Sequence, residues 1–353
     1  MVYLAIKELS NSAEDVIMVT SSILKDMQSN QDAVYRPNAI RALCKIIDVR
    51  PLTVFNSQPL SFLQPAMVQS VERYFKAYIV DKNPSIASAA LVSAYHLYPK
   101  AENVAKRWVN EALEALSPRS SSSFFAGAQS SSLGGASSYL GFGSSAPATP
   151  TMISIPSTSY ISQYHALGFL YGIRQSDRMA VTKMIQQLGG GRSGAGTSMK
   201  NPMALCMLIR YASKIMHEDP KYVLTFPIFS PPYHFNSLQK PMFDLLEGWL
   251  RHKSDMVNYE AARAICQMRG VMAPQLTRSI AQLQLFLSSP KPTLKFAAIR
   301  TLSALAVTHP SSVAACNVDM ENLISDPNRS IATYAITTLL KVRRPPPGPP
   351  TQL

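Results

Sequence analysis

The sequence predicts an all-α protein in which pairs of helices stack in a row, an α-solenoid. The first observation is a five-residue pattern, alanine-apolar-x-x-apolar, that returns along the chain. Residues with this spacing share one face of a helix, and the small alanine lets a neighbouring helix come close. The pattern begins at Ala5, Ala39, Ala90, Ala166, Ala261, Ala298 and Ala335.

The second observation is the spacing of these patterns. Ala298 follows Ala261 by 37 residues, Ala335 follows Ala298 by the same interval, and Ala39 follows Ala5 by 34. The longer intervals return to about the same period once three irregular segments are set aside, and a helix at Ala204 fits between two of the patterns. This period is typical of stacked HEAT or armadillo-like repeats, in which no unit buries its apolar face alone. We therefore predict one solenoid over residues 1–342.

The three irregular segments are expected to be insertions. Residues 51–67 contain three prolines, residues 117–158 are rich in Ser, Gly, Ala and Pro, and residues 219–240 contain four prolines. Low-complexity sequence such as 117–158 cannot bury enough apolar surface to offset the entropy of ordering it. The tail, residues 343–353, is proline-rich as well.

The rest of the chain is expected to be helical. Acidic residues at 14–15 suit the positive end of a helix dipole, Pro37 is tolerated near a helix start, and Asn83-Pro84 opens the next helix. The expected helices cover 2–9, 13–27, 35–48, 68–80, 85–97, 103–116, 161–173, 177–188, 202–217, 241–252, 256–268, 274–287, 293–308, 320–324 and 331–342.

Composition restricts the partners and the compartment. Lys and Arg outnumber Asp and Glu by 34 to 21, a formal net charge of +13. This excess favours acidic partners such as anionic lipid or an acidic protein face, and a basic solvated surface within a larger, charge-balanced assembly is an equal alternative. The four cysteines lie far apart in apolar runs, which predicts buried free thiols. Without a signal peptide or a membrane-length apolar run, we expect a cytosolic protein.

No motif indicates catalysis, a cofactor or a metal. The run at 191–198 approximates a phosphate-binding loop, but Thr197 stands where lysine is needed and the run follows a helix, so a linker is favoured. The six histidines have no metal-ligand spacing, and the sequence contains no nucleophile motif. The basic residues are scattered and lack interleaved aromatic residues, which argues against nucleic-acid binding. We expect a protein that is not an enzyme.

Several stretches go beyond a generic repeat and resemble the gamma subunits of coatomer, the COPI vesicle coat. The residues that carry this resemblance are 13–22 (AEDVIMVTSS), 35–44 (YRPNAIRALC), 79–84 (IVDKNP), 89–93 (AALVS), 106–111 (KRWVNE), 163–168 (QYHALG), 177–181 (DRMAV) and 325–341 (SDPNRSIATYAITTLLK). They are collinear with the family and cover most of the chain outside the insertions. The family pattern extends beyond both ends of the chain, which is therefore expected to correspond to part of a longer subunit.

The resemblance implies an adaptin-like trunk that has a structural role in Golgi-to-endoplasmic-reticulum and intra-Golgi vesicle transport. Such a trunk is expected to hold a zeta-type small subunit, to assemble with a beta-type large subunit and to contact a GTP-bound Arf-family GTPase at the cytosolic face of the Golgi membrane. The alternatives are a clathrin-adaptor-type large subunit, a nuclear transport receptor or another helical-repeat transport scaffold.

We nominate four polar residues of the first helices for the GTPase contact. They lie at the amino-terminal end of the predicted trunk, where basic side chains suit both an anionic membrane and an acidic partner. All four are expected to be exposed. They are Lys7, Glu8, Arg36 and Arg41.

Overall fold

The computed structural model describes residues 2–9, 16–28, 34–48, 63–116, 160–189, 199–217, 239–268 and 271–343. Every regular element in these ranges is helical. The first half contains α1 (Val2–Leu9), α2 (Val16–Asp26), α3 (Tyr35–Asp48), α4 (Leu63–Ile79), α5 (Pro84–Leu97), α6 (Glu102–Ala105), a short 3-10 turn and α7 (Val109–Leu116). The second half contains α8 (Ile161–Arg174), α9 (Arg178–Gly189), α10 (Pro202–His217), α11 (Gln239–Trp249), α12 (Asp255–Gln267), α13 (Ala273–Leu287), α14 (Pro292–Leu305), α15 (Pro310–Val313), α16 (Asn317–Asn322) and α17 (Arg329–Arg343).

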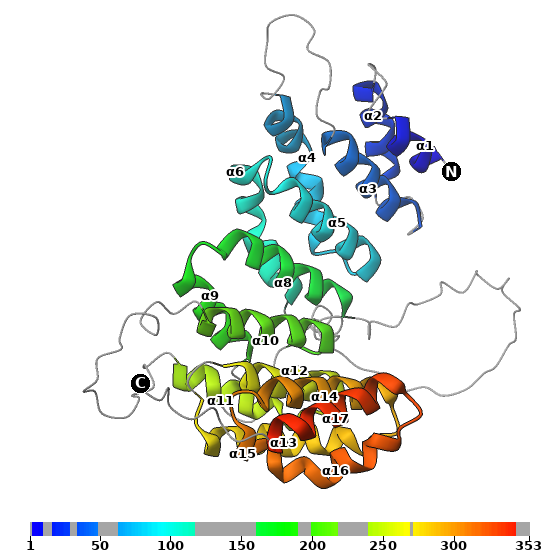
Figure 1. The fold of residues 1–353 in the computed structure, drawn as a ribbon. Helices are drawn as coiled ribbons and strands as arrows, with labels where there is room; N and C mark the ends of the chain where they lie inside the picture. Colours follow the sequence, from blue (N-terminus) through cyan, green and yellow to red (C-terminus); the bar gives the residue numbers. More distant parts are fainter. Residues whose placement is uncertain are drawn as a thin grey trace, which may run out of the picture.

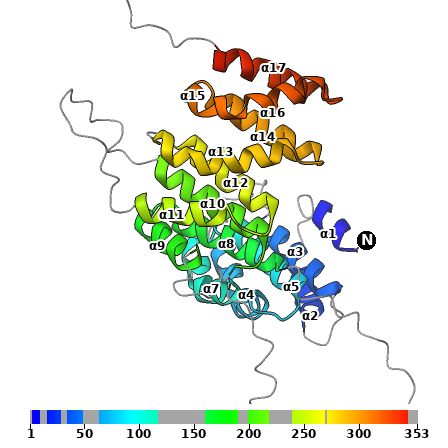
Figure 2. The ribbon, with the colours of Figure 1, turned by 90° about the horizontal axis from the view of Figure 1, so that it is seen from below.

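The helices stack in one long row of two layers (Figure 1). One layer consists of the helices that carry the alanine pattern, and each of them packs against the next: α1, α3, α5, α8, α10, α12, α14 and α17. The other layer contains α2, α4, α7, α9, α11, α13, α15 and α16. The row bends, and Figure 2 shows the alanine-marked layer on the inner side of the bend. This arrangement confirms the predicted all-α solenoid.

The alanines of the repeated pattern belong to the buried core of the row. Ala39, Ala90, Ala166, Ala204, Ala261, Ala298 and Ala335 are completely buried. A methyl group at these positions allows each helix to approach its neighbour closely, and the apolar residues of the pattern fill the space between the layers. Ala5 is exposed, because α1 packs chiefly against one helix, α3.

A buried glutamine connects segments that are far apart in the sequence. Gln163, near the start of α8, donates a hydrogen bond from Nε2 to the carbonyl of Leu116 at 2.9 Å. Its Oε1 accepts hydrogen bonds from the backbone N–H groups of Lys200 and Asn201 at 3.0 and 3.3 Å. Asn201 in turn accepts a hydrogen bond from the N–H of Met203 at 2.8 Å and so caps α10. The side chain of Gln163 therefore fixes the end of α7, α8 and the start of α10 together.

Two of the expected insertions are shorter than predicted, because residues at their carboxyl-terminal ends are helical. Residues 63–67 belong to α4, and Pro65 is tolerated there because it lies in the first turn of the helix. Residues 239–240 open α11. The rest of 51–67 and 219–240, all of 117–158, residues 190–198 of the glycine-rich run and 344–353 lie outside the described residues.

Three further observations bear on the sequence analysis. The four-residue helix α15 was not expected, because its sequence is too short to show a period. None of the four cysteines, all of which lie in the described ranges, forms a disulfide, and three of them are buried: Cys44, Cys206 and Cys316. In the part of the chain that is described, no helix is both long enough and apolar enough to cross a membrane.

Candidate functional site

Arg36, one of the four nominated residues, is not exposed. Its Nη2 is 2.9 Å from Oδ2 of Asp81, and the two side chains are only 13% and 19% exposed. Its guanidinium also lies 5.2 Å from the ring centroid of Tyr78, within the range of a cation–π contact. Asp81 further accepts a hydrogen bond from the N–H of Asn83 at 2.8 Å. Arg36 thus links the start of α3 to the end of α4, and the expectation that it is exposed is wrong.

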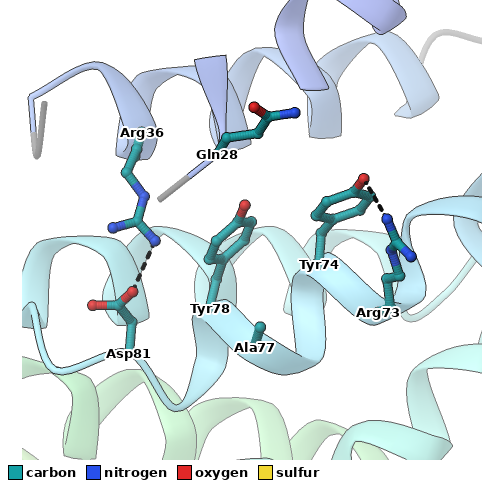
Figure 3. Close-up of a pocket in the computed structure, with 7 residues that line it drawn as sticks. All are labelled: Gln28, Arg36, Arg73, Tyr74, Ala77, Tyr78 and Asp81. Atoms are coloured by element: carbon teal, nitrogen blue, oxygen red, sulfur yellow. Dashed lines mark hydrogen bonds and ion pairs between the residues drawn. The ribbon is translucent and has the colours of Figure 1, made fainter. Parts of the chain in front are cut away.

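The ion pair lies at one end of an open groove of about 430 Å³ between the α2–α3 corner and α4. Figure 3 shows Arg36 and Gln28 on one side of this groove and the side chains of α4 on the other. Arg73, at the opposite end, donates a hydrogen bond to the hydroxyl of Tyr74 at 2.9 Å, and its guanidinium lies 4.8 Å from that ring's centroid. The groove is lined by Gln28, Arg36, Arg73, Tyr74, Ala77, Tyr78 and Asp81.

The middle of the groove is held by a buried tyrosine. The hydroxyl of Tyr78 donates a hydrogen bond to the carbonyl of Met27, which ties α4 to the end of α2. Burial raises the pKa of Tyr78, although the nearby Arg36 guanidinium opposes this shift. A tyrosine that is buried and hydrogen-bonded in this way stays neutral and holds the helices in register. The contacts of Tyr78 are those of a structural residue, not of a catalytic group.

Arg41 lies on a different face of α3. It is five residues after Arg36, which corresponds to a rotation of about 140° around the helix. Its side chain is exposed, and its Nη1 donates a hydrogen bond to Oδ1 of Asn38 at 3.3 Å. Because the outer layer covers the back of α3, the exposed side chain of Arg41 faces the inner side of the bend. Arg36 and Arg41 therefore do not belong to one surface.

The remaining two nominated residues lie on α1. Lys7 occupies the same position of the alanine pattern as Arg41, two residues after the alanine, and α1 packs against α3. Its side chain lies outside the described residues. Glu8 is exposed. The backbone thus brings the positions of Lys7, Glu8 and Arg41 to adjacent helices, and their role in a partner contact stays a prediction.

Apart from Arg36, sequence reasoning did not single out the residues that line the groove. Asp81 and Arg36 are 45 positions apart, and no local pattern pairs a charge at the start of one helix with a charge at the end of another. The only signal was Asp81 itself, which lies beside the helix-opening Asn83-Pro84 and could have been expected to bond to backbone there.

Taken together, the two-layered row of helices and its inner face define a helical-repeat solenoid protein. A family model described as the adaptin N terminal region matches residues 1–343. The chain belongs to this family.

Among curated proteins, the chain is similar to gamma subunits of coatomer. Coatomer subunit gamma of Arabidopsis thaliana is 44% identical over 341 residues, which are 97% of this chain and 30% of that protein. The Drosophila melanogaster protein of the same name is 44% identical over 343 residues, with the same coverage. The resemblance expected from the motifs is thus confirmed, and the chain spans 30% of the length of these relatives.

The fold is also similar to that of a chain in a homology model of the full-length AP-3 complex in an intermediate open conformation. The TM-score is 0.57 at 10% sequence identity, and the match covers 96% of this chain and 54% of that one. At this identity, the similarity concerns the fold alone.

Proposed function

We propose that this chain is the trunk of a structural subunit of a COPI-type vesicle coat. The observation that carries the proposal is the similarity to coatomer gamma subunits over 97% of the chain, on a fold that forms one continuous curved row. A curved solenoid offers a long inner face to partners. The contacts described above are those of structural residues. The function is therefore binding and scaffolding in transport from the Golgi to the endoplasmic reticulum and within the Golgi.

The proposed partners follow from this function. A zeta-type small coat subunit occupies the bend, a beta-type large subunit joins the same coat, and a GTP-loaded Arf-family GTPase contacts the amino-terminal helices. The complex then lies on the cytosolic face of the Golgi membrane. The net charge of +13 supports contact with acidic partners or with anionic lipid headgroups.

Complex formation with the small subunit tests the proposal. We expect the purified full chain to elute together with a coatomer zeta-type subunit in size-exclusion chromatography, at one copy of each. The small subunit of a clathrin adaptor is the matched control and should elute separately. Separate elution of the zeta-type subunit, or equal capture of both small subunits, would contradict a COPI-specific function.

Arg41→Glu tests the GTPase contact. Because Arg41 is exposed and its hydrogen bond to Asn38 is local, reversing its charge should leave the melting temperature at pH 7.5 nearly unchanged. Capture by immobilised GTP-loaded Arf-family GTPase should fall about tenfold, the effect expected when an attractive charge at an interface becomes repulsive. Lys183→Glu is the control, because Lys183 is exposed on α9 in the outer layer. Equal capture of both variants would remove Arg41 from the contact.

A further inference from the structure

A cluster of three arginines lies on the inner face of the second half of the row. Arg210 is on α10, Arg263 on α12 and Arg300 on α14, so they come from consecutive helices of the inner layer. Arg263 and Arg300 both lie two residues after the alanine of their repeat, and Arg210 lies beside Arg263 because both bind Glu260. The side chain of Arg210 is 65% exposed, that of Arg263 is 34% exposed, and Arg300 is exposed too. Side chains exposed in the middle of these helices face the inner side of the bend.

Among the described residues, Glu260 is the carboxylate that pairs with arginines of this cluster. Oε1 of Glu260, which is only 5% exposed, is 2.7 Å from Nε of Arg210 and 2.5 Å from Nη2 of Arg263. Two guanidinium groups have ten N–H donors, far more than one carboxylate can accept. Nε of Arg263 is buried without a hydrogen-bond partner. Among the described residues, Arg300 forms no ion pair. The cluster therefore has an excess of positive charge and of hydrogen-bond donors.

Tyrosines extend this cluster towards the middle of the row. The rings of Tyr171 on α8 and Tyr211 on α10 stack with centroids 3.6 Å apart and an angle of 4° between planes. Tyr95 on α5 is 50% exposed, and its ring lies so close to Gly172 that a Cβ there would meet it at 3.2 Å. Tyr211 directly follows Arg210 in the sequence. The three tyrosines thus come from α5, α8 and α10, and the three arginines come from α10 and the two inner helices that follow it, α12 and α14.

We propose that this arginine–tyrosine surface, made of Tyr95, Tyr171, Tyr211, Arg210, Arg263 and Arg300, binds an acidic segment of a protein partner that carries an apolar anchor. The inference rests on the proposed scaffold function and specifies the chemistry of the segment that the inner face accepts. Carboxylates of the segment pair with Arg300 and with the free donors of Arg210 and Arg263, and the anchor packs on the ring of Tyr95. Tyrosine and arginine are the residues that most often dominate binding energy at interfaces.

Two other anionic occupants fit less well. A lipid bilayer is flat on the scale of one protein and does not follow the inside of a bend. Single-stranded nucleic acid stacks its bases on open aromatic faces, but Tyr171 and Tyr211 cover one face of each other. A protein segment is not subject to either restriction, because it needs only the guanidinium groups, the exposed ring of Tyr95 and the tyrosine hydroxyls.

Fluorescence anisotropy with a labelled peptide tests the proposal on the full chain. The probe is a short peptide with two central phenylalanines flanked by glutamates, and the matched probe has lysines in place of the glutamates. We expect the glutamate peptide to bind the wild-type chain and the lysine peptide not to bind. Arg300→Glu should weaken binding about tenfold, because one favourable charge pair becomes repulsive. Tyr95→Ala should weaken it severalfold, and Lys183→Glu on the outer layer should have no effect.

Each contrary result overturns the proposal. No binding of the glutamate peptide, equal binding of all variants, or tighter binding of oligouridylate or of anionic vesicles at the same residues would each exclude an acidic protein segment. Arg300 and Tyr95 are exposed, so their variants should fold, and circular dichroism checks this. Capture of a zeta-type subunit with unchanged peptide binding by Arg300→Glu would reject this inference alone. The expected peptide results without capture of the subunit would reject the coat function alone.

Discussion

Protonation of the His165 imidazole is coupled to folding. It lies on α8, its Nδ1 is 2.7 Å from Oγ of Ser88 on α5, and it is half-buried. Burial lowers the pKa of His165, and the positive charge of Arg41 adds to this effect. Burial likewise lowers the pKa of His252, whose Nδ1 accepts a hydrogen bond from the N–H of Ser254 at 3.1 Å. Both imidazoles therefore bind a proton less readily in the folded chain than in the unfolded chain.

This coupling predicts how stability depends on pH. Between the unfolded pKa of about 6.5 and the lower folded value, the unfolded chain binds more protons, so the free energy of unfolding falls as the pH is lowered. We expect the melting temperature to fall from pH 7.5 to pH 5.5, and His165→Gln to reduce this fall. His252→Gln should reduce it further. An unchanged pH dependence in the double variant would refute the coupling.

The contact between α9 and α11 depends on the absence of one side chain. Gly189 ends α9, and a Cβ at this position would lie 2.8 Å from Cζ2 of Trp249, whose ring is buried. An indole ring in a packed core cannot easily move, so the glycine is required for close approach of the two helices. Gly248, the neighbour of Trp249 on α11, is the opposite case, because a Cβ there would meet nothing within 4 Å.

These two glycines form a matched pair of test positions. Gly189→Ala should lower the free energy of unfolding by about 1–3 kcal/mol through overpacking against the indole ring. Gly248→Ala should raise it by roughly 0.5 kcal/mol, because alanine restricts the unfolded chain more than glycine does and meets no obstacle in this last turn of α11. Urea unfolding measures both. Equal effects of the two substitutions would contradict the described packing of α9 on α11.

Across the whole molecule, stability is built from contacts between near neighbours. From α3 onwards, the helices of the inner layer pack against their neighbours in that layer and against the outer helices beside them. In such a row, folding free energy is approximately a sum over repeats and the interfaces between them. The pair of Arg36 and Asp81, together with the cap that Asn83 forms at the start of α5, joins α3, α4 and α5. The ring of Tyr78 beside Arg36 connects them to the end of α2.

A local change should therefore have a local effect. Arg36→Ala leaves the carboxylate of Asp81 largely buried without its partner and should cost about 2 kcal/mol, less than a fully buried pair because of partial exposure. Hydrogen exchange should become faster in α2–α5 and stay unchanged in α13–α17. Asp81→Asn is a second variant with the same expected pattern. Equal acceleration along the entire chain would instead indicate a single cooperative unit.

The sequence by itself determined the class of fold, because a repeated alanine-marked stripe can be buried only by other copies of itself. The spacing of Ala261, Ala298 and Ala335 predicts both the helices of the inner layer and their period. The helix over 35–48 begins and ends at the expected residues. The start of α4 at Leu63 was missed, since three prolines within 17 residues obscured the helical pattern.

Only the tertiary structure decided which side chains share a surface. Arg36 and Arg41 look alike in the sequence, but a rotation of about 140° buries one against Asp81 and exposes the other on the inner face. Arg263 and Arg300 occupy the same position of the repeat, so the period alone indicates that they face the same side. Whether Tyr95 and Arg210 lie on the same surface depends on which helices pack side by side. The physical reason is that helix formation is governed by neighbours in sequence, whereas a binding surface is assembled from residues that meet only when the row has stacked.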